Sequence, residues 1–224
     1  MIGISSARRV VLAVEEAGIP ESLVDFATSL CGVKHLPLLA QLRLEPGLDT
    51  AADLSFVSLV DRSGSARREW TPREALLSRA RLLNRWQERL RALAAGGQLT
   101  AEVEARKCSR SEQLETLIAG GDFVVMSSSR AAPAFEPAPE RVIVLDFHAT
   151  DGVMQLAREV CRKLRIPLES WSAATLGELS TRLGAAGAGS GITLVLARAA
   201  LESSAVQVLS TFLRGRGRGL VIVP

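Results

Sequence analysis

Short apolar runs alternate with amphipathic stretches along the first half of the chain. The apolar runs predict four strands, and the connections between them are of helix length or contain a helix, so the strands are expected to be parallel. Helical spacing predicts helices from Glu21 to Leu30 and from Thr71 to Gly96-Gly97. Residues 45–70 show neither period and are expected to form a loop. The strands are predicted at residues 9–14, 36–42, 99–105 and 122–126.

The stretch that follows the third strand has the strongest local signals. Ser109 and Glu112 have the spacing of a capping box, and Gly120-Gly121 ends the helix that they begin. Phe123–Met126 is a short apolar run typical of a strand buried on both faces. Serines follow it, at the carboxyl end of a parallel strand, where open α/β sheets bind their ligands.

Residues 131–140 contain three prolines and have the composition of a semi-rigid linker. The pattern of strands and helices then starts again, and Thr175 with Glu178 has the spacing of a second capping box. The two halves form a weak internal repeat, in which a strand and an amphipathic helix lead to Cys31 or to Cys161. The predicted strands are 141–146, 168–171, 192–197 and 220–223, and the predicted helices are 151–164 and 201–213.

Val10–Glu15, Phe123–Met126 and the serine loop that follows resemble the first strand, the last core strand and the phosphate loop of the universal stress protein family. The resemblance implies an α/β fold with two open parallel sheets of the adenine-nucleotide-alpha-hydrolase type in tandem, each flanked by helices. Residues 1–130 would form one such domain with a long second helix, residues 131–140 the linker, and residues 141–224 a shortened second domain.

The resemblance also implies where a nucleotide would lie. Its candidate contacts after the first strand are Ala13, Val14 and Glu15, where the family places an Asp; after the fourth strand they are Met126, Ser127, Ser128, Ser129 and Arg130. ATP-binding members have a glycine-rich loop at the second position, because glycine lets backbone N–H groups approach phosphate closely. This chain lacks those glycines, and we expect it to need no cofactor, with weakly bound ATP as the alternative.

In the second half, Asp146 stands at the acidic position, but residues 197–203 contain no glycine. His35 and His148 have no nucleophile at catalytic spacing, and no pair of residues has the spacing of metal ligands. The sequence therefore predicts no catalytic residue and no metal site.

The composition excludes several other classes of protein. A net charge of +3, spread along the chain, makes a nucleic-acid partner unlikely even with the Arg-Gly run at 214–219. The three scattered cysteines are typical of reduced thiols in the cytoplasm. No apolar run reaches the roughly 18 residues of a membrane span, so no insertion in a membrane is expected. Strand 220–223 is too apolar for a free edge, which predicts self-association through it or a face-to-face contact between the halves, with dimers as one outcome.

These observations favour a non-catalytic regulatory or stress-response protein with degenerate nucleotide sites. Two alternatives stay open: an ATP-binding switch with weak ATPase activity, and a cytoplasmic regulator of a membrane transporter, such as a cation/proton antiporter, acting as a protein partner. Fold alone does not decide among them.

Overall fold

The computed structural model describes residues 7–15, 21–54, 58–60, 67–96, 99–128, 141–145, 151–172, 178, 181, 191–201, 205–214 and 218–224. Ser129, Arg130, Asp146, the predicted linker at 131–140 and most of the predicted helix start at Thr175 lie outside the described residues.

The first half forms four parallel strands in the order β5-β2-β1-β6. The parallel arrangement predicted from the apolar runs is confirmed. β1 and β6 lie inside the sheet and are buried along their whole length, as their continuous apolar sequences require. Their bounds are β1 (Val10–Glu15), β2 (Leu38–Leu44), β5 (Ala101–Lys107) and β6 (Phe123–Ser127).

The second half continues the same sheet. β10 pairs with β6 in antiparallel register, Val221 opposite Val125, so that one eight-stranded sheet runs in the order β5-β2-β1-β6-β10-β9-β7-β8. Every other neighbouring pair is parallel. The additional strands are β7 (Arg141–Leu145), β8 (Leu168–Trp171), β9 (Ile192–Ala197) and β10 (Arg218–Val223).

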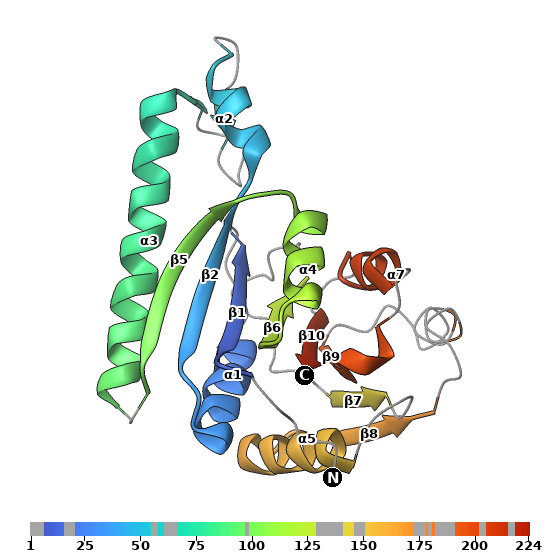
Figure 1. Cartoon of the computed structure of the whole chain (residues 1–224). Coiled ribbons are helices and arrows are strands. Elements are labelled where there is room, and N and C mark those ends of the chain that lie inside the picture. Colours follow the sequence, from blue (N-terminus) through green and yellow to red (C-terminus); the bar gives the residue numbers. More distant parts are fainter. Residues whose placement is uncertain are drawn as a thin grey trace.

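Two expectations about the halves were therefore wrong. They do not form two separate sheets, and they meet edge to edge rather than face to face. The physical reason is that β6 and β10 each have a row of backbone N–H and C=O groups that needs a partner, and pairing the two strands satisfies both rows. Figure 1 shows the terminal strand β10 inside the sheet.

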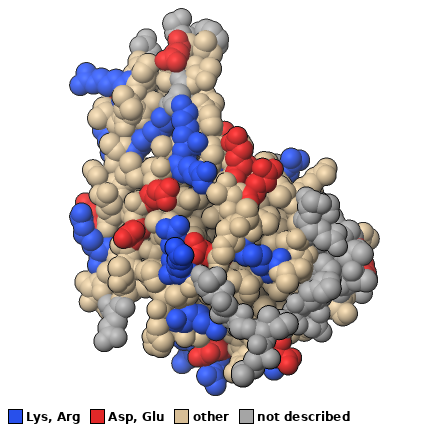
Figure 2. Space-filling view, viewed as in Figure 1, with Lys and Arg blue, Asp and Glu red and all other residues tan. Residues whose placement is uncertain are grey.

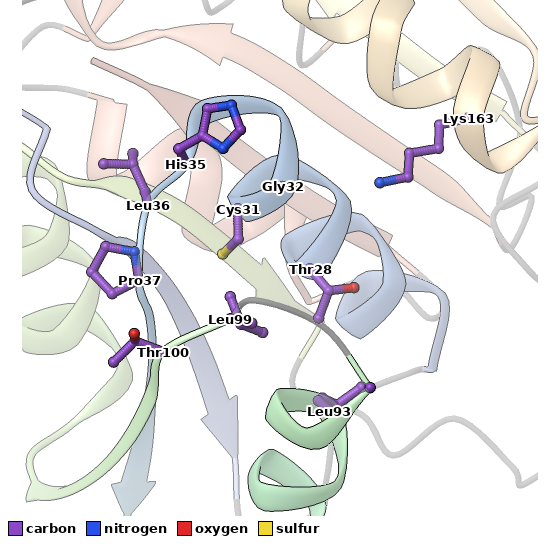
Figure 3. Close-up of a pocket in the computed structure, with 11 residues that line it drawn as sticks. Thr28, Cys31, Gly32, His35, Leu36, Pro37, Leu93, Leu99, Thr100 and Lys163 are labelled. Carbon is purple, nitrogen blue, oxygen red and sulfur yellow. The ribbon is translucent and has the colours of Figure 1, made fainter.

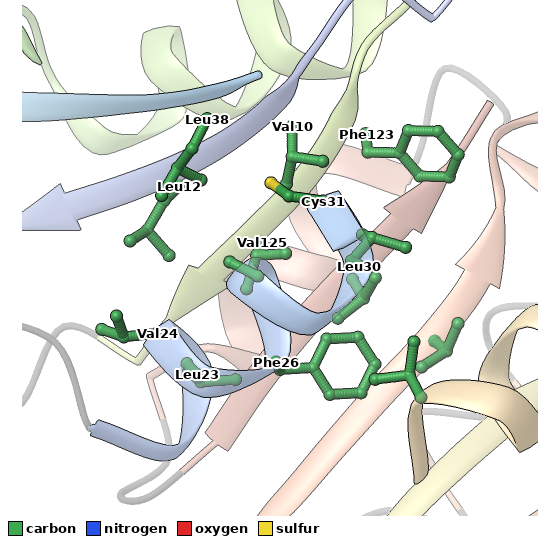
Figure 4. Packing of buried hydrophobic residues seen from close by; sticks show 14 of the residues in the cluster. Val10, Leu12, Leu23, Val24, Phe26, Leu30, Cys31, Leu38, Phe123 and Val125 are labelled. Atoms are coloured by element: carbon green, nitrogen blue, oxygen red, sulfur yellow. The ribbon is translucent and has the colours of Figure 1, made fainter. Parts of the chain in front are cut away.

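Helices cover both faces of this sheet. One apolar cluster joins α1 (Glu21–Lys34), α3 (Pro72–Ala95) and α5 (Asp151–Leu164) to residues such as Val10 and Leu12. A second cluster joins α4 (Arg110–Ala119) and α7 (Ala205–Phe212) to the alternate strand residues. Figure 4 shows the apolar face of α1 against β1 and β6. The helices α1 and α5 pack on each other, as do α4 and α7, so both layers cross the junction of the halves.

The internal repeat is sharpest at the ends of α1 and α5, which are both 14 residues long. Each ends at a residue with positive φ, His35 at 54° and Arg165 at 57°. The next residue donates its N–H back to the cysteine carbonyl, Leu36 to Cys31 at 3.1 Å and Ile166 to Cys161 at 3.0 Å. These are the bonds of a Schellman helix end. The repeated sequence therefore specifies a repeated turn.

Several elements differ from the prediction. The segment expected to be a loop contains α2 (Pro46–Ala52), which begins with a proline as helices often do. It also contains the hairpin of β3 (Ser58–Val60) and β4 (Arg67–Glu69). β2 begins at Leu38 rather than at residue 36, because Pro37 has no N–H for the ladder. A short 3-10 turn, η1 (Arg198–Ala200), directly precedes Leu201, the predicted start of the last helix, and the helix observed there, α7, begins at Ala205.

Candidate functional site

The described candidate residues lie together at the carboxyl ends of β1 and β6. Ala13 of β1 is in register with Met126 of β6, and both are buried. Val14 and Glu15 complete β1, while Ser127 ends β6, Ser128 follows it, and both serines are also buried. The sequence therefore identified a real convergence of strand ends, and the adjoining candidates Ser129 and Arg130 lie outside the described residues.

Glu15 is the centre of a buried ion-pair cluster. Only 6% of its surface is exposed. One carboxylate oxygen, Oε1, accepts a hydrogen bond from Nη1 of Arg110, and the other, Oε2, lies 3.5 Å from Nη2 of Arg43. Glu15 is directly opposite Arg43 in the β1–β2 register, which brings the two charges together. Arg43 also pairs with Glu45. The acidic side chain at the end of β1 is therefore engaged by cations of the chain itself.

The two arginines experience different electrostatic surroundings. Burial lowers the pKa of Arg110, although the Glu15 carboxylate opposes this effect. Burial also acts to lower the pKa of Arg43, but the hydrogen bond that Arg43 donates to Glu45 and the charges of Glu15 and Glu45 outweigh it and raise that pKa. An arginine stays protonated in either case, so Arg43 and Arg110 both keep their positive charge near neutral pH.

The loop after β6 is held by backbone contacts. The N–H of Ser128 donates to the carbonyl of Arg218 at 2.7 Å, which extends the β6–β10 ladder by one residue. The carbonyl of Ser127 accepts a bond of 2.6 Å from Nη2 of Arg110. A phosphate loop offers free backbone N–H groups to its anion. Here the N–H of Ser128 is already bonded to β10 and is not free for an anion.

The amino end of α4 is also closed. The hydroxyl of Ser109 accepts from the N–H of Glu112 at 3.3 Å, and the Glu112 carboxylate accepts from the N–H of Ser109 at 2.7 Å. This is the capping box that the sequence predicted, and it is confirmed. The backbone hydrogen bond from Ser109 lowers the pKa of Glu112, which therefore keeps a negative charge at the positive end of the helix. A second anion is therefore stabilised less at this helix end than at one without a cap.

In the second half the acidic candidate Asp146 lies outside the described residues. The residue that follows β9, Arg198, turns toward the first half. Its guanidinium donates to the carbonyls of Leu117, at 2.9 Å, and of Ile118 at the end of α4, and to the carbonyl of Asp122. Burial lowers its pKa, while the charge of Asp122 raises it. Arg198 thus joins the halves and caps α4.

Sequence reasoning missed Arg43 and Arg110, the two partners of Glu15. A signal for Arg43 was present, because it is a charge within the apolar run of β2, and such a residue is 8% exposed only when another charge pairs with it. Arg110 gave no such signal, since the first turn of a surface helix accepts any charged residue. Its direction toward Glu15 follows from how α4 packs on the sheet.

Three further features of the described residues bear on function: metal ligands, surface charge and membrane-spanning helices. They contain no group of three or more His, Cys, Asp or Glu placed to hold a metal ion. Figure 2 shows lysine and arginine interspersed with aspartate and glutamate on the face that it presents. None of the helices in the described part of the chain has both the length and the apolar character needed to cross a membrane.

No family model matches the sequence, and no curated protein is significantly similar to it. Two solved structures from Pseudomonas aeruginosa are similar over 98% of this chain, each at 11% identity and a TM-score of 0.45. One is a protein of unknown function from strain PAO1, of which 93% is covered, and the other is described as a candidate universal stress protein from strain UCBPP-PA14, of which 94% is covered. At this TM-score the likeness carries no argument about function.

Proposed function

We propose that this chain is a non-catalytic regulatory protein of the universal stress protein type, in which the chain's own side chains close the nucleotide position. The stress-response part of this proposal rests on the resemblance in sequence. The closure rests on one observation, the buried cluster in which Glu15 pairs with Arg110 and Arg43 while Arg110 also binds the carbonyl of Ser127.

The cluster opposes nucleotide binding in two ways. A ribose or phosphate at this position has to displace Arg110 from Glu15 and Ser127, and separating a buried ion pair costs about 3–5 kcal/mol. Among the described residues, the N–H groups nearest this position are already used, because Ser128 donates to β10 and Ser109 and Glu112 cap each other. We therefore expect the protein to act through its surfaces on protein partners.

Titration with magnesium-ATP tests the closure. We expect calorimetry to give a Kd no tighter than about 100 μM. A Kd of about 10 μM would add about 2.7 kcal/mol of stability at about 1 mM ATP. In a chain of this size that corresponds to a rise of about 5–10 °C in Tm. The expected result is a much smaller rise and no phosphate release above the rate without protein.

A second function, the ATP-binding switch, is favoured by a different observation. Arg43 and Arg110 each have a buried Nε that finds no hydrogen-bond partner within the described part of the chain. Buried donors of this kind cost about 1–3 kcal/mol each, and an anion could satisfy them. The same titration separates the two functions, because low-micromolar, magnesium-dependent binding would establish the switch and reject the closed site.

Two arginine substitutions can locate the site of any weak nucleotide binding. Arg130→Ala should reduce it more than Arg198→Ala, since Arg130 follows the serine loop whereas Arg198 caps α4 from the second half. Equal effects of the two substitutions would place the nucleotide elsewhere on the protein.

A further inference from the structure

A cavity lies at the end of the first-half strands opposite to Glu15. Its volume is about 750 Å³, within the range of small-molecule pockets. Its walls come from the last turns of α1 and α3 and from the segments that lead into β2 and β5. Figure 3 shows Leu36 and Pro37 beside Leu93 and Leu99 around this space, with Thr100 at the start of β5. The walls therefore combine apolar side chains with polar ones, among them the hydroxyl-bearing Thr28 and Thr100.

Among the described residues of the second half, Lys163 of α5 lines this cavity. Its ammonium lies above the backbone of α1, where a Cβ added to Gly32 would come within 3.5 Å of Nζ. Figure 3 shows the side chain extending from α5 toward α1. The side chains of Lys163 and of His35, which follows α1, make no hydrogen bond or ion pair with another described residue. One cation and one imidazole thus border the cavity without partners among those residues.

The charges near this cavity favour one sign of ligand. His35 and Lys163 are the titratable groups of its described lining together with Cys31, and that lining contains no carboxylate. Burial raises the pKa of the Cys31 thiol to about 12, so this side chain is neutral and does not repel an anion. A carboxylate, that of Glu159, lines an adjoining groove together with Arg162 and Lys163. The apolar walls accept a hydrocarbon body, and the border accepts an anionic head.

We propose that this cavity, closed by Lys163 from the second half, binds a small amphipathic anion with its apolar body between α1 and α3 and its anionic head at Lys163. The C-terminal end of α1 carries partial negative charge, which Lys163 also offsets. If Lys163 only stabilises that helix end, replacing it should change the stability of the protein alone. If it binds the ligand, replacing it should change the affinity by an amount that depends on the charge of the ligand head.

Three ten-carbon probes that differ only in the head group test this: decanoate, decan-1-ol and decylamine, each below its aggregation limit. Calorimetry with the full chain should give a Kd of about 50 μM for decanoate and at least tenfold weaker binding of the other two. Lys163→Met should weaken decanoate about tenfold and leave decan-1-ol unchanged within about twofold. Thr100→Trp, which fills the cavity from its exposed border, should remove binding of decanoate.

The matched control is Arg162→Gln, a neighbouring cation on α5 that lines only the adjoining groove. It should leave the affinity for decanoate unchanged within about twofold. The proposal is overturned if decanoate binds no tighter than decan-1-ol, if Lys163→Met and Arg162→Gln have equal effects, or if none of the probes binds with a Kd below about 1 mM. A fall in Tm in Lys163→Met with unaltered decanoate affinity would assign Lys163 to the helix end alone.

Discussion

Arg110 is the residue on which the closed site depends most directly. It meets both a Glu15 oxygen and the Ser127 carbonyl, so Arg110→Ala leaves a buried carboxylate with one cation, Arg43, at 3.5 Å. We expect a loss of about 2–4 kcal/mol in the free energy of unfolding, measured by urea titration. Arg106→Ala is the control, because Arg106 is exposed on β5, and it should change stability by less than about 0.5 kcal/mol. Equal losses in the two variants would mean that the buried cluster contributes no stability.

The repeated cysteines predict a loss of stability in alkaline solution. Burial raises the pKa of Cys31 to about 12 and that of Cys161 to about 11. The unfolded chain ionises these thiols near pH 9 while the folded protein keeps them protonated, so stability is full below pH 9 and falls as pH rises toward 11. Each thiol should contribute a fall of roughly 1 kcal/mol between about pH 9 and pH 10.

The measurement is the slope of unfolding free energy against pH for the native sequence and for the double variant Cys31→Ala, Cys161→Ala. The slope isolates the thiols, because the cost of removing two buried sulfur atoms does not vary with pH. A double variant with the same alkaline slope as the native protein would show that the folded state does not shift these pKa values.

Within β10, Gly219 has a packing role that its neighbours do not share. A Cβ at this position would lie 2.7 Å from Oγ1 of Thr193 and 2.8 Å from Cδ2 of Leu23, distances that side chains do not tolerate. Gly219→Ala should therefore reduce stability by about 1–3 kcal/mol, because the buried side chains of Thr193 and Leu23 have to shift. In Gly121→Ala the new Cβ meets nothing within 4 Å, and we expect a change below about 0.5 kcal/mol in the same urea titration. A neutral Gly219→Ala would mean that α1 can shift away from β10 without cost.

Elements with a local cause could be predicted from the sequence. Thr71 and Ser109 cap their helices as expected, since a cap needs only residues a few positions apart. β1 and β6 are continuous apolar runs and were predicted to within a residue. The hairpin of β3 and β4 escaped notice because strands of three residues are too short to show a period. The ends of β1 and β6 could likewise be located, but the cations that fill the space between them could not.

The junction of the halves depends on information that no short segment contains. β6 and β10 are both apolar strands with similar sequences, and either could have paired with a second copy of the chain. Their antiparallel pairing follows from the way that α1 packs on α5 and α4 on α7, which are contacts between residues far apart in sequence. The internal repeat is visible in the matching ends of α1 and α5, but a repeat does not specify which strand edges meet.

This junction predicts that the covalent connection is dispensable once the chain has folded. A protease site placed within residues 131–140 allows the native protein to be cut after purification. The fragments should stay together, because the β6–β10 ladder, the helix pairs and the bonds from Arg198 to the end of α4 all cross the junction. Size-exclusion chromatography should show one species with the mass of the uncut chain. Its urea midpoint should rise with protein concentration, since unfolding now separates two chains.

Val221→Pro removes a donor from β10 and, in the cut protein, should release the fragments. Separation of the unaltered fragments on cutting alone would show that the edge contact is too weak to join the halves.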